Sequence, residues 1–176
     1  HKGFLKFLII RHSYYTNEIM INIVTNYKDL GLLSPIVKKL TKSFSSIKSF
    51  INSVTSKKSG VSTGEEQYIL FGDDSIYEQL NGLKFKISPE SFFQPNTAQA
   101  ENLYKLIKKE AKLKKNDVLY DLFCGTGTIG IYLSKFCKSV YGFEIVMSAI
   151  NDAMINANIN NIKNATFICG DLMNVF

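Results

Sequence analysis

Apolar and polar positions in the first part of the chain predict short strands around one helix. Phe4–Arg11 and Glu18–Thr25 are apolar runs rich in β-branched residues, and the turn-like Ser13–Asn17 separates them, so we expect a β-hairpin. A Ser-Pro pair follows, which is typical of an N-cap and first helical turn. This pair predicts a short helix over Pro35–Phe44.

The next stretch predicts further strands separated by polar segments. Ile47–Val54 alternates apolar and polar positions, as a half-buried strand does, and Lys57–Gln67 is a polar loop. Strands are also predicted at Tyr68–Phe71, Ser75–Leu80 and Leu83–Ile87, with Asn81–Gly82 as a type I′ turn between the last two. The first 88 residues are therefore mostly strands, without the pattern of a parallel sheet.

From Pro95 onward the pattern changes to helices that alternate with apolar strands. Thr97–Leu113 is predicted to be a helix with Asn96 or Thr97 as its N-cap. Its apolar face would consist of Ala100, Leu103, Leu106, Ile107 and Ala111. Strands are then predicted at Val118–Phe123, Ser139–Glu144 and Thr166–Cys169, with helices between them at Ile129–Phe136 and Ser148–Asn158. This alternation is typical of the first half of a doubly wound parallel sheet.

The chain therefore has two parts with different patterns. Residues 1–88 form a mainly β segment, and residues 89–176 form the first half of an α/β domain. Three parallel strands are about half of a doubly wound sheet. The chain also does not begin with Met, so we expect a fragment of a longer protein whose sheet has a cut edge.

Composition excludes several classes of protein. The 176 residues are 45% hydrophobic and 12% aromatic, which argues against intrinsic disorder. No apolar run approaches the ~18 residues of a membrane span, and the first residues do not resemble a secretory signal. Three Cys without paired spacing exclude a disulfide framework, and the His and Cys residues show no metal-ligand spacing. We therefore expect a protein without a metal or membrane contact in a reducing intracellular compartment, which is the cytoplasm, the nucleus or an organelle.

The excess of positive charge is confined to one end of the chain. Residues 1–66 contain ten Lys or Arg and four Asp or Glu, whereas residues 67–176 contain eleven of each kind. Such an excess predicts a surface for a polyanion, and the alternative is a Lys-rich face that is merely solvated. Arg11 is the single Arg, and its planar guanidinium suits bidentate contact with a phosphate or a base. An ion pair inside the fold is the alternative role for Arg11.

A glycine-rich turn follows the first strand of the α/β part. Gly125, Gly127 and Gly130 form G-x-G-x-x-G, a pattern of dinucleotide-binding turns. Asp121, however, lies four residues before Gly125, in a strand that is apolar in dinucleotide-binding units. The resulting D-x-x-x-G-x-G pattern suits S-adenosylmethionine. Its glycines admit a ligand close to the backbone, and its carboxylate attracts the ammonium or sulfonium charge of that ligand.

Carboxylates also follow the next two predicted strands. Glu144 ends the second strand, where a carboxylate accepts hydrogen bonds from both ribose hydroxyls of either cofactor class. Asp171 follows the third strand and is placed to meet the adenine, with a loop or capping role as the alternative. Cys124 lies beside the glycine turn with no base near it in sequence. We interpret it as a structural thiol and not as a nucleophile.

Three segments resemble one enzyme family. They are Phe85–Asn96 (FKISPESFFQPN), Asp121–Gly127 (DLFCGTG) and Val140–Glu144 (VYGFE). In these segments the chain is similar to the S-adenosylmethionine-dependent RNA uracil-5-methyltransferases of the TrmA/RumA type. The first segment is the most specific, because it is not a general methyltransferase feature. The resemblance covers nearly the whole chain, with residues 38–67 matching least, and its glycine turn and the long loop before Tyr68 resemble the eukaryotic tRNA members.

The resemblance implies the fold class and a set of cofactor contacts. The fold class would be α/β, the first half of a Rossmann-like class I methyltransferase sheet preceded by a mainly β segment that faces RNA. The implied contacts with S-adenosylmethionine are Gln94, Phe123, Gly125, Gly127, Thr128, Glu144 and Asp171. Thr128 stands where bacterial members often have Asn, which is the longer polar side chain.

The resemblance also implies which catalytic groups this chain lacks. The family's nucleophilic Cys and general-base Glu would lie beyond Phe176, so the chain would contain no catalytic residue and would be inactive alone. In the family a thiolate adds to uracil C6, C5 takes the methyl group, and a base removes the C5 proton. We therefore expect C5 methylation of a uridine in RNA, tRNA rather than rRNA, by a monomer, with Arg11 as a candidate RNA contact.

Two other classes of function stay open from the sequence. One is an NAD(P)-dependent oxidoreductase that uses the glycine-rich turn for its dinucleotide. The other is a non-catalytic RNA-binding fragment. If the nucleophile lies beyond Phe176, this description applies to the present chain by itself.

Overall fold

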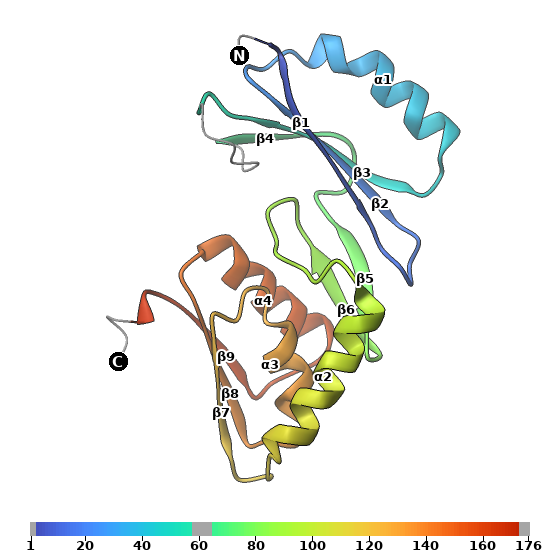
Figure 1. Ribbon diagram of the computed structural model, residues 1–176. Helices are drawn as coiled ribbons and strands as arrows, with labels where there is room; N and C mark the ends of the chain where they lie inside the picture. The colour runs from blue at the N-terminus through green and yellow to red at the C-terminus, as the bar shows by residue number, and fades with distance from the viewer. Residues whose placement is uncertain (1–2, 58–64, 173–176) are drawn as a thin grey trace. The chain divides into compact units, whose positions relative to one another are not determined.

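The computed structural model describes residues 3–57 and 65–172 (Figure 1). The chain divides into two compact units, residues 1–77 and 78–176. This division falls upstream of the boundary at residue 88 that the pattern suggested, because the second hairpin packs with the α/β part. Most of the predicted polar loop at Lys57–Gln67 lies outside the described residues.

The first unit is a four-stranded sheet with one helix. Its elements are β1 (Leu5–His12), β2 (Ile19–Thr25), α1 (Leu30–Ser43), β3 (Ile47–Val54) and β4 (Glu66–Gly72). The strand order is β1-β2-β3-β4, and β1 pairs antiparallel with β2 as the hairpin prediction required. β2 and β3, however, pair in parallel. The prediction of no parallel pattern was therefore wrong, because α1 serves as the crossover that a parallel connection needs.

The helix α1 begins earlier than the Ser-Pro pair suggested. It starts at Leu30 with Asp29 as its N-cap, whose Oδ1 accepts a hydrogen bond from Leu32 N at 3.2 Å. Pro35 therefore lies inside the helix, so the predicted start at Pro35 was wrong. A side-chain cap upstream outweighs the one backbone hydrogen bond that a helical Pro lacks.

The strand β3 is buried along most of its length, contrary to the half-buried strand that its alternation predicted. Ser49, Asn52 and Ser53 are all inaccessible to solvent, because β3 lies between β2 and β4. Asn52 Nδ2 donates to Ile23 O at 2.8 Å and to Thr25 Oγ1 at 3.0 Å. Small or hydrogen-bonded polar side chains thus occupy positions that look solvent-facing in the sequence.

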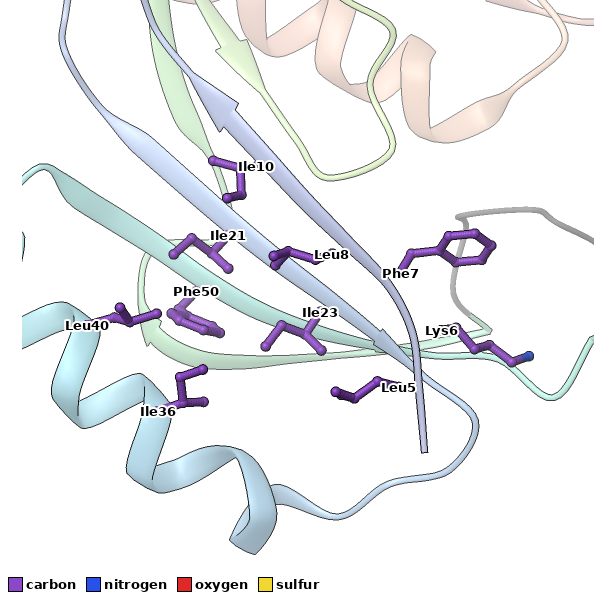
Figure 2. Close-up of a pocket in the computed structure, with 10 residues that line it drawn as sticks. All are labelled: Leu5, Lys6, Phe7, Leu8, Ile10, Ile21, Ile23, Ile36, Leu40 and Phe50. Atoms are coloured by element: carbon purple, nitrogen blue, oxygen red, sulfur yellow. The ribbon is translucent and has the colours of Figure 1, made fainter. Parts of the chain in front are cut away.

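The apolar core of the first unit lies between α1 and the sheet. Leu33 and Val37 of α1 pack against Ile21, Ile23 and Phe50. The edge strand β1 is covered less well, since Leu8 and Ile10 are 63% and 59% exposed. A groove of about 290 Å³ runs beside them (Figure 2), and the side chains of β1, the neighbouring strands and α1 line it.

The second unit combines a hairpin with a parallel sheet. Its elements are β5 (Ile76–Leu80), β6 (Leu83–Ile87), α2 (Thr97–Ala111), β7 (Val118–Leu122), α3 (Thr128–Leu133), a 3₁₀ turn (Ser134–Phe136), β8 (Ser139–Glu144), α4 (Met147–Ile159) and β9 (Ala165–Cys169). β7, β8 and β9 pair in parallel in that order, as predicted. Asn81 and Gly82 both have positive φ angles, 51° and 77°, as a type I′ turn requires.

The helix α2 presents a different face to the core from the one predicted. Its N-cap is Asn96, one of the two candidates, but Thr97, Ala100 and Tyr104 are the buried residues. Leu103 and Leu106 are 44% and 51% exposed, so their assignment to the core face was wrong. Tyr104 takes that place because its ring packs against Tyr132 and its hydroxyl finds a partner on α3. No helix among the described residues is long and apolar enough to cross a membrane.

Phe50 should be the residue on which the first unit's stability depends most. It is fully buried on β3. Phe50→Ala is expected to lower the free energy of unfolding by roughly 3–5 kcal/mol, because a large cavity replaces the ring. Phe71 faces Phe50 across the β3–β4 pair but is 42% exposed. Phe71→Ala is therefore the matched control, with a loss of less than about 1.5 kcal/mol expected in denaturant titrations. Equal losses would contradict this account of the core.

Candidate functional site

The glycine turn joins β7 to α3 through residues in the left-handed region. Phe123, Gly125 and Gly127 have φ angles of 61°, 54° and 75°. A Cβ at Gly125 would meet no atom within 4 Å, whereas at Gly127 it would lie 2.8 Å from Phe167 Cε1. Gly127 is therefore required by packing beneath the turn. Gly125 faces open space, where a ligand can approach the backbone.

Asp121 is part of the start of α3. Its Oδ2 accepts a hydrogen bond from Gly130 N at 2.8 Å. Gly127, which precedes α3, has no side chain that could cap the helix. Asp121 thus supplies from β7 the carboxylate that a helix N-terminus favours. Burial raises the pKa of Asp121, and the bond from Gly130 opposes that effect. Its attraction for a ligand cation stays a prediction beside this structural role.

Glu144 contacts the glycine turn from the carboxyl end of β8. Its Oε2 accepts from Gly125 N at 3.2 Å, and its Oε1 accepts from the N–H groups of Ile145 and Val146 at 2.8 and 3.0 Å. A carboxylate has about four acceptor positions. This arrangement leaves one acceptor position on Oε2 for a ligand hydroxyl. For Glu144 to accept from two ribose hydroxyls, as the sequence suggested, one of its three hydrogen bonds from backbone N–H groups would have to break.

The remaining predicted contact residues lie around this turn with different surroundings. Thr128 Oγ1 shares a 2.7 Å hydrogen bond with the hydroxyl of Tyr104, so α2 holds this side chain. Asp171 is exposed just after β9, and Gly170 N before it donates to Glu144 O at 3.0 Å. Gln94 is half-buried in the segment between β6 and α2. The structure therefore brings Gly125, Glu144 and the end of β9 together.

Sequence reasoning missed an apolar rim beside Glu144. Ile145, Val146 and Met147 follow that carboxylate and are 64%, 50% and 58% exposed. Phe123, which the resemblance already implied as a contact, is 77% exposed. Exposed apolar side chains next to a few oriented polar groups are typical of small-molecule sites. The available signal was the run of three apolar residues directly after the acid that ends the strand.

Cys124 is unsuited to nucleophilic chemistry. Its side chain is buried, and burial, followed by the charges of Asp121 and Glu144, raises the pKa of the thiol to about 12. The thiolate is the reactive form of cysteine, and at neutral pH this thiol stays protonated. This agrees with the structural role inferred from the sequence.

Arg11 lies in β1 opposite Met20 of β2, in the first unit, whereas the glycine turn belongs to the second unit. It is half-buried, and burial lowers the pKa of its guanidinium. The RNA contact of Arg11 stays a prediction. Within residues 3–57 and 65–172, no group of three or more His, Cys, Asp or Glu could hold a metal ion.

Comparisons with known proteins point to one family. Residues 35–170 match the family described as tRNA (uracil-5-)-methyltransferase. An uncharacterized RNA methyltransferase of Chlorobaculum tepidum is 41% identical over 175 residues, which are 99% of this chain and 36% of that protein. Another, from Clostridium tetani, is 42% identical over 171 residues, 97% of this chain and 37% of that protein.

A solved structure is similar over both units. The crystal structure of a tRNA (uracil-54, C5)-methyltransferase from Pyrococcus abyssi, in complex with S-adenosyl-L-homocysteine, has 35% identity and a TM-score of 0.76. The match covers 97% of this chain and 40% of that one. These relatives are bacterial and archaeal, so the narrower resemblance to eukaryotic tRNA members stays a prediction.

The parallel sheet, the glycine turn and the terminal Glu144 define the first half of a Rossmann-like class I methyltransferase domain, which confirms the predicted fold class. The chain belongs to the tRNA (uracil-5-)-methyltransferase family. It spans little more than a third of the length of the two bacterial relatives, at 36% and 37%.

The thiol of Cys124 should resist alkylation in the folded protein. Iodoacetamide near neutral pH is expected to modify Cys169, which is partly exposed, and to leave Cys124 intact, because a buried thiol with a pKa of about 12 forms almost no thiolate. Peptide mass spectrometry reads both sites, and labelling in denaturant serves as the control in which all cysteines react. Rapid labelling of Cys124 in the native protein would show that its environment activates the thiol.

Proposed function

We propose that this chain carries the S-adenosylmethionine site of an enzyme that methylates C5 of a uridine in tRNA. The observation that carries the proposal is the contact between Glu144 and Gly125 N, which joins an acid to an open glycine turn. Membership of the tRNA (uracil-5-)-methyltransferase family and the similar Pyrococcus abyssi structure support it. tRNA is favoured over rRNA on the same grounds.

The residues of this chain fit such a cofactor. Glu144 would accept a ribose hydroxyl through Oε2, and Gly125 would admit the ligand to the backbone. The exposed rings and chains of Phe123, Ile145 and Val146 would cover its flat apolar part. Gln94, Gly127, Thr128 and Asp171 are the other proposed contacts. When bound, S-adenosylmethionine supplies the methyl group that is transferred.

The nucleophile and general base are proposed to lie in the part of the protein beyond Phe176. The raised pKa of Cys124 supports this assignment, because the cysteine nearest the glycine turn stays a neutral thiol. We therefore expect the isolated chain to transfer no methyl group. We also propose that the full-length enzyme is an intracellular monomer.

The positive first unit is proposed to face the RNA. Its excess of Lys and Arg over Asp and Glu supports this, since phosphate contacts dominate the affinity of proteins for nucleic acids. Arg11 is the proposed first contact within it.

Replacing Glu144 should weaken cofactor binding without unfolding the protein. Glu144→Gln is expected to raise the Kd for S-adenosylhomocysteine in the full-length protein by about tenfold to a hundredfold, the scale of a lost hydrogen bond to a charged group. Glu110→Gln, an exposed position on α2, is the matched control. Calorimetry measures both, with NADH as a second ligand. Unchanged affinity for S-adenosylhomocysteine in Glu144→Gln, or binding of NADH instead, would contradict the proposed function.

Arg11 should contribute to the salt dependence of RNA binding. Arg11→Ala in the full-length enzyme is expected to weaken tRNA binding and to flatten the slope of log affinity against log salt by roughly 0.7 per lost phosphate contact. Cofactor affinity should not change. Combined replacement of Lys38, Lys39 and Lys42, all exposed on α1, tests whether that helix is merely solvated. An unaltered slope with a lower melting temperature would assign Arg11 to the fold alone.

A further inference from the structure

Two polar residues of α4 and its C-cap residue bind the edge of β6. Asp152 and Asn156 lie on α4, Asn160 is the C-cap, and the spacing of four residues places them in one row. They face Ser88, Lys86 and Lys84, which are spaced two residues apart along β6 and its end. Four residues of helix advance about 6 Å and two residues of strand about 6.6 Å, so the two rows stay in step. We call these six residues the polar ladder.

The outer contacts of the polar ladder fasten β6 and the turn after it. Asn160 Oδ1 accepts from Lys84 N at 2.9 Å, and its Nδ2 donates to Lys84 O at 2.7 Å. At the other end, the buried carboxylate of Asp152 accepts from the hydroxyls of Ser88 and Ser91. Ser91 N in turn donates to Ser88 O at 3.1 Å, which closes the turn ahead of the segment containing Gln94.

The middle residue, Asn156, has a second connection that the outer two lack. Its Oδ1 accepts from Lys86 N at 2.6 Å, and its Nδ2 donates to Thr126 O at 3.2 Å. Thr126 lies between Gly125 and Gly127, and both Asn156 and Thr126 are buried. One amide group therefore links the strand β6 to the glycine turn.

We propose that Asn156 is a positioning residue for the cofactor, which sets the glycine turn against the segment that carries Gln94. This inference rests on the proposed function. The link from β6 through Asn156 holds the carbonyl side of the peptide between Thr126 and Gly127, while the N–H of Gly127 donates to Cys124 O at 2.9 Å. Both contacts orient this peptide, in a turn where Phe123, Gly125 and Gly127 have positive φ angles. Gly125 N, one residue earlier, is the group that Glu144 binds.

The physical reason lies in the burial of the carbonyl. Loss of the Asn156 amide would leave the partly strained turn without this bond, and a buried carbonyl without a partner is costly. The turn would then adopt other peptide orientations, and only a fraction of the molecules would have the orientation that binds the ligand. The apparent Kd of the ligand is its intrinsic Kd divided by that fraction, so binding becomes weaker.

The test compares Asn156→Ala with Asn160→Ala in the full-length protein. Asn160 lies in the same row and binds the same strand, but its amide does not contact the glycine turn. Asn156→Ala is expected to raise the Kd for S-adenosylhomocysteine and the KM for S-adenosylmethionine about tenfold, the scale of one buried hydrogen bond, with a smaller change in kcat. Asn160→Ala should lower the melting temperature while leaving the Kd within about twofold of wild type.

A second variant keeps the test decisive if Asn156→Ala does not fold. Asn156→Asp has the same shape and keeps the acceptor for Lys86 N but removes the amide donor to Thr126 O, so it should weaken cofactor binding in the same direction. Equal effects of the Asn156 and Asn160 variants on the Kd, or an unchanged Kd in both Asn156 variants, would overturn the proposal. A wild-type protein that does not bind S-adenosylhomocysteine would instead overturn the proposed function.

Discussion

The hydrogen bond from Gly130 N to Asp121 is the contact on which the glycine turn depends. It ties the first turn of α3 to the last part of β7, so the chain must reverse within the few residues between them. A side chain at Gly130 would place its Cβ 3.0 Å from Asp121 Oδ2 and 2.9 Å from Val140 Cγ1. The close approach of α3 to β7 thus fixes the conformation of the turn. This conformation places Gly125 N within hydrogen-bond distance of Glu144.

Two carboxylates on either side of the turn give it a negative character. Burial raises the pKa of Cys124 most, and the charges of Asp121 and Glu144 raise it further. The same charges favour a cationic group near them. Burial and these two charges together disfavour a thiolate at Cys124, and the same two charges would favour the positively charged ligand that we propose.

The sequence predicted the elements of the second unit better than their packing. β8 occupies the predicted range Ser139–Glu144, because the short apolar run Val140–Phe143 between two polar residues is typical of a strand inside a parallel sheet. The prediction for α2 was wrong because both Leu and Tyr side chains can occupy a core face, and Tyr132 and Thr128, which are distant in sequence, favour Tyr104. The start of α1 was wrong because two capping signals, Asp29 and the Ser-Pro pair, lie close together. Local sequence patterns predict where helices and strands occur. Where two local patterns are equally strong, contacts with residues distant in sequence determine the helix start or the buried face.

The same limit applies to the site. The spacing of Glu144, Gly125 and Gly127 from a strand end predicts them as cofactor contacts, and this role stays a prediction. Asn156 was not identified, since a single Asn on a helix looks like a surface residue, although it is fully buried. Its signal was the four-residue spacing with Asp152 and Asn160, which gains meaning only once β6 is known to lie alongside.

The backbone of Phe123 has a consequence for protein engineering. A non-glycine residue held at a φ angle of 61° destabilises the fold by roughly 1–2 kcal/mol, and this ring is 77% exposed, so packing returns little of that energy. Glycine at this position would relieve the strain. A selection for thermostability alone would therefore favour Phe123→Gly and discard the ring, so stability at this position would compete with the ligand contact that we propose for it.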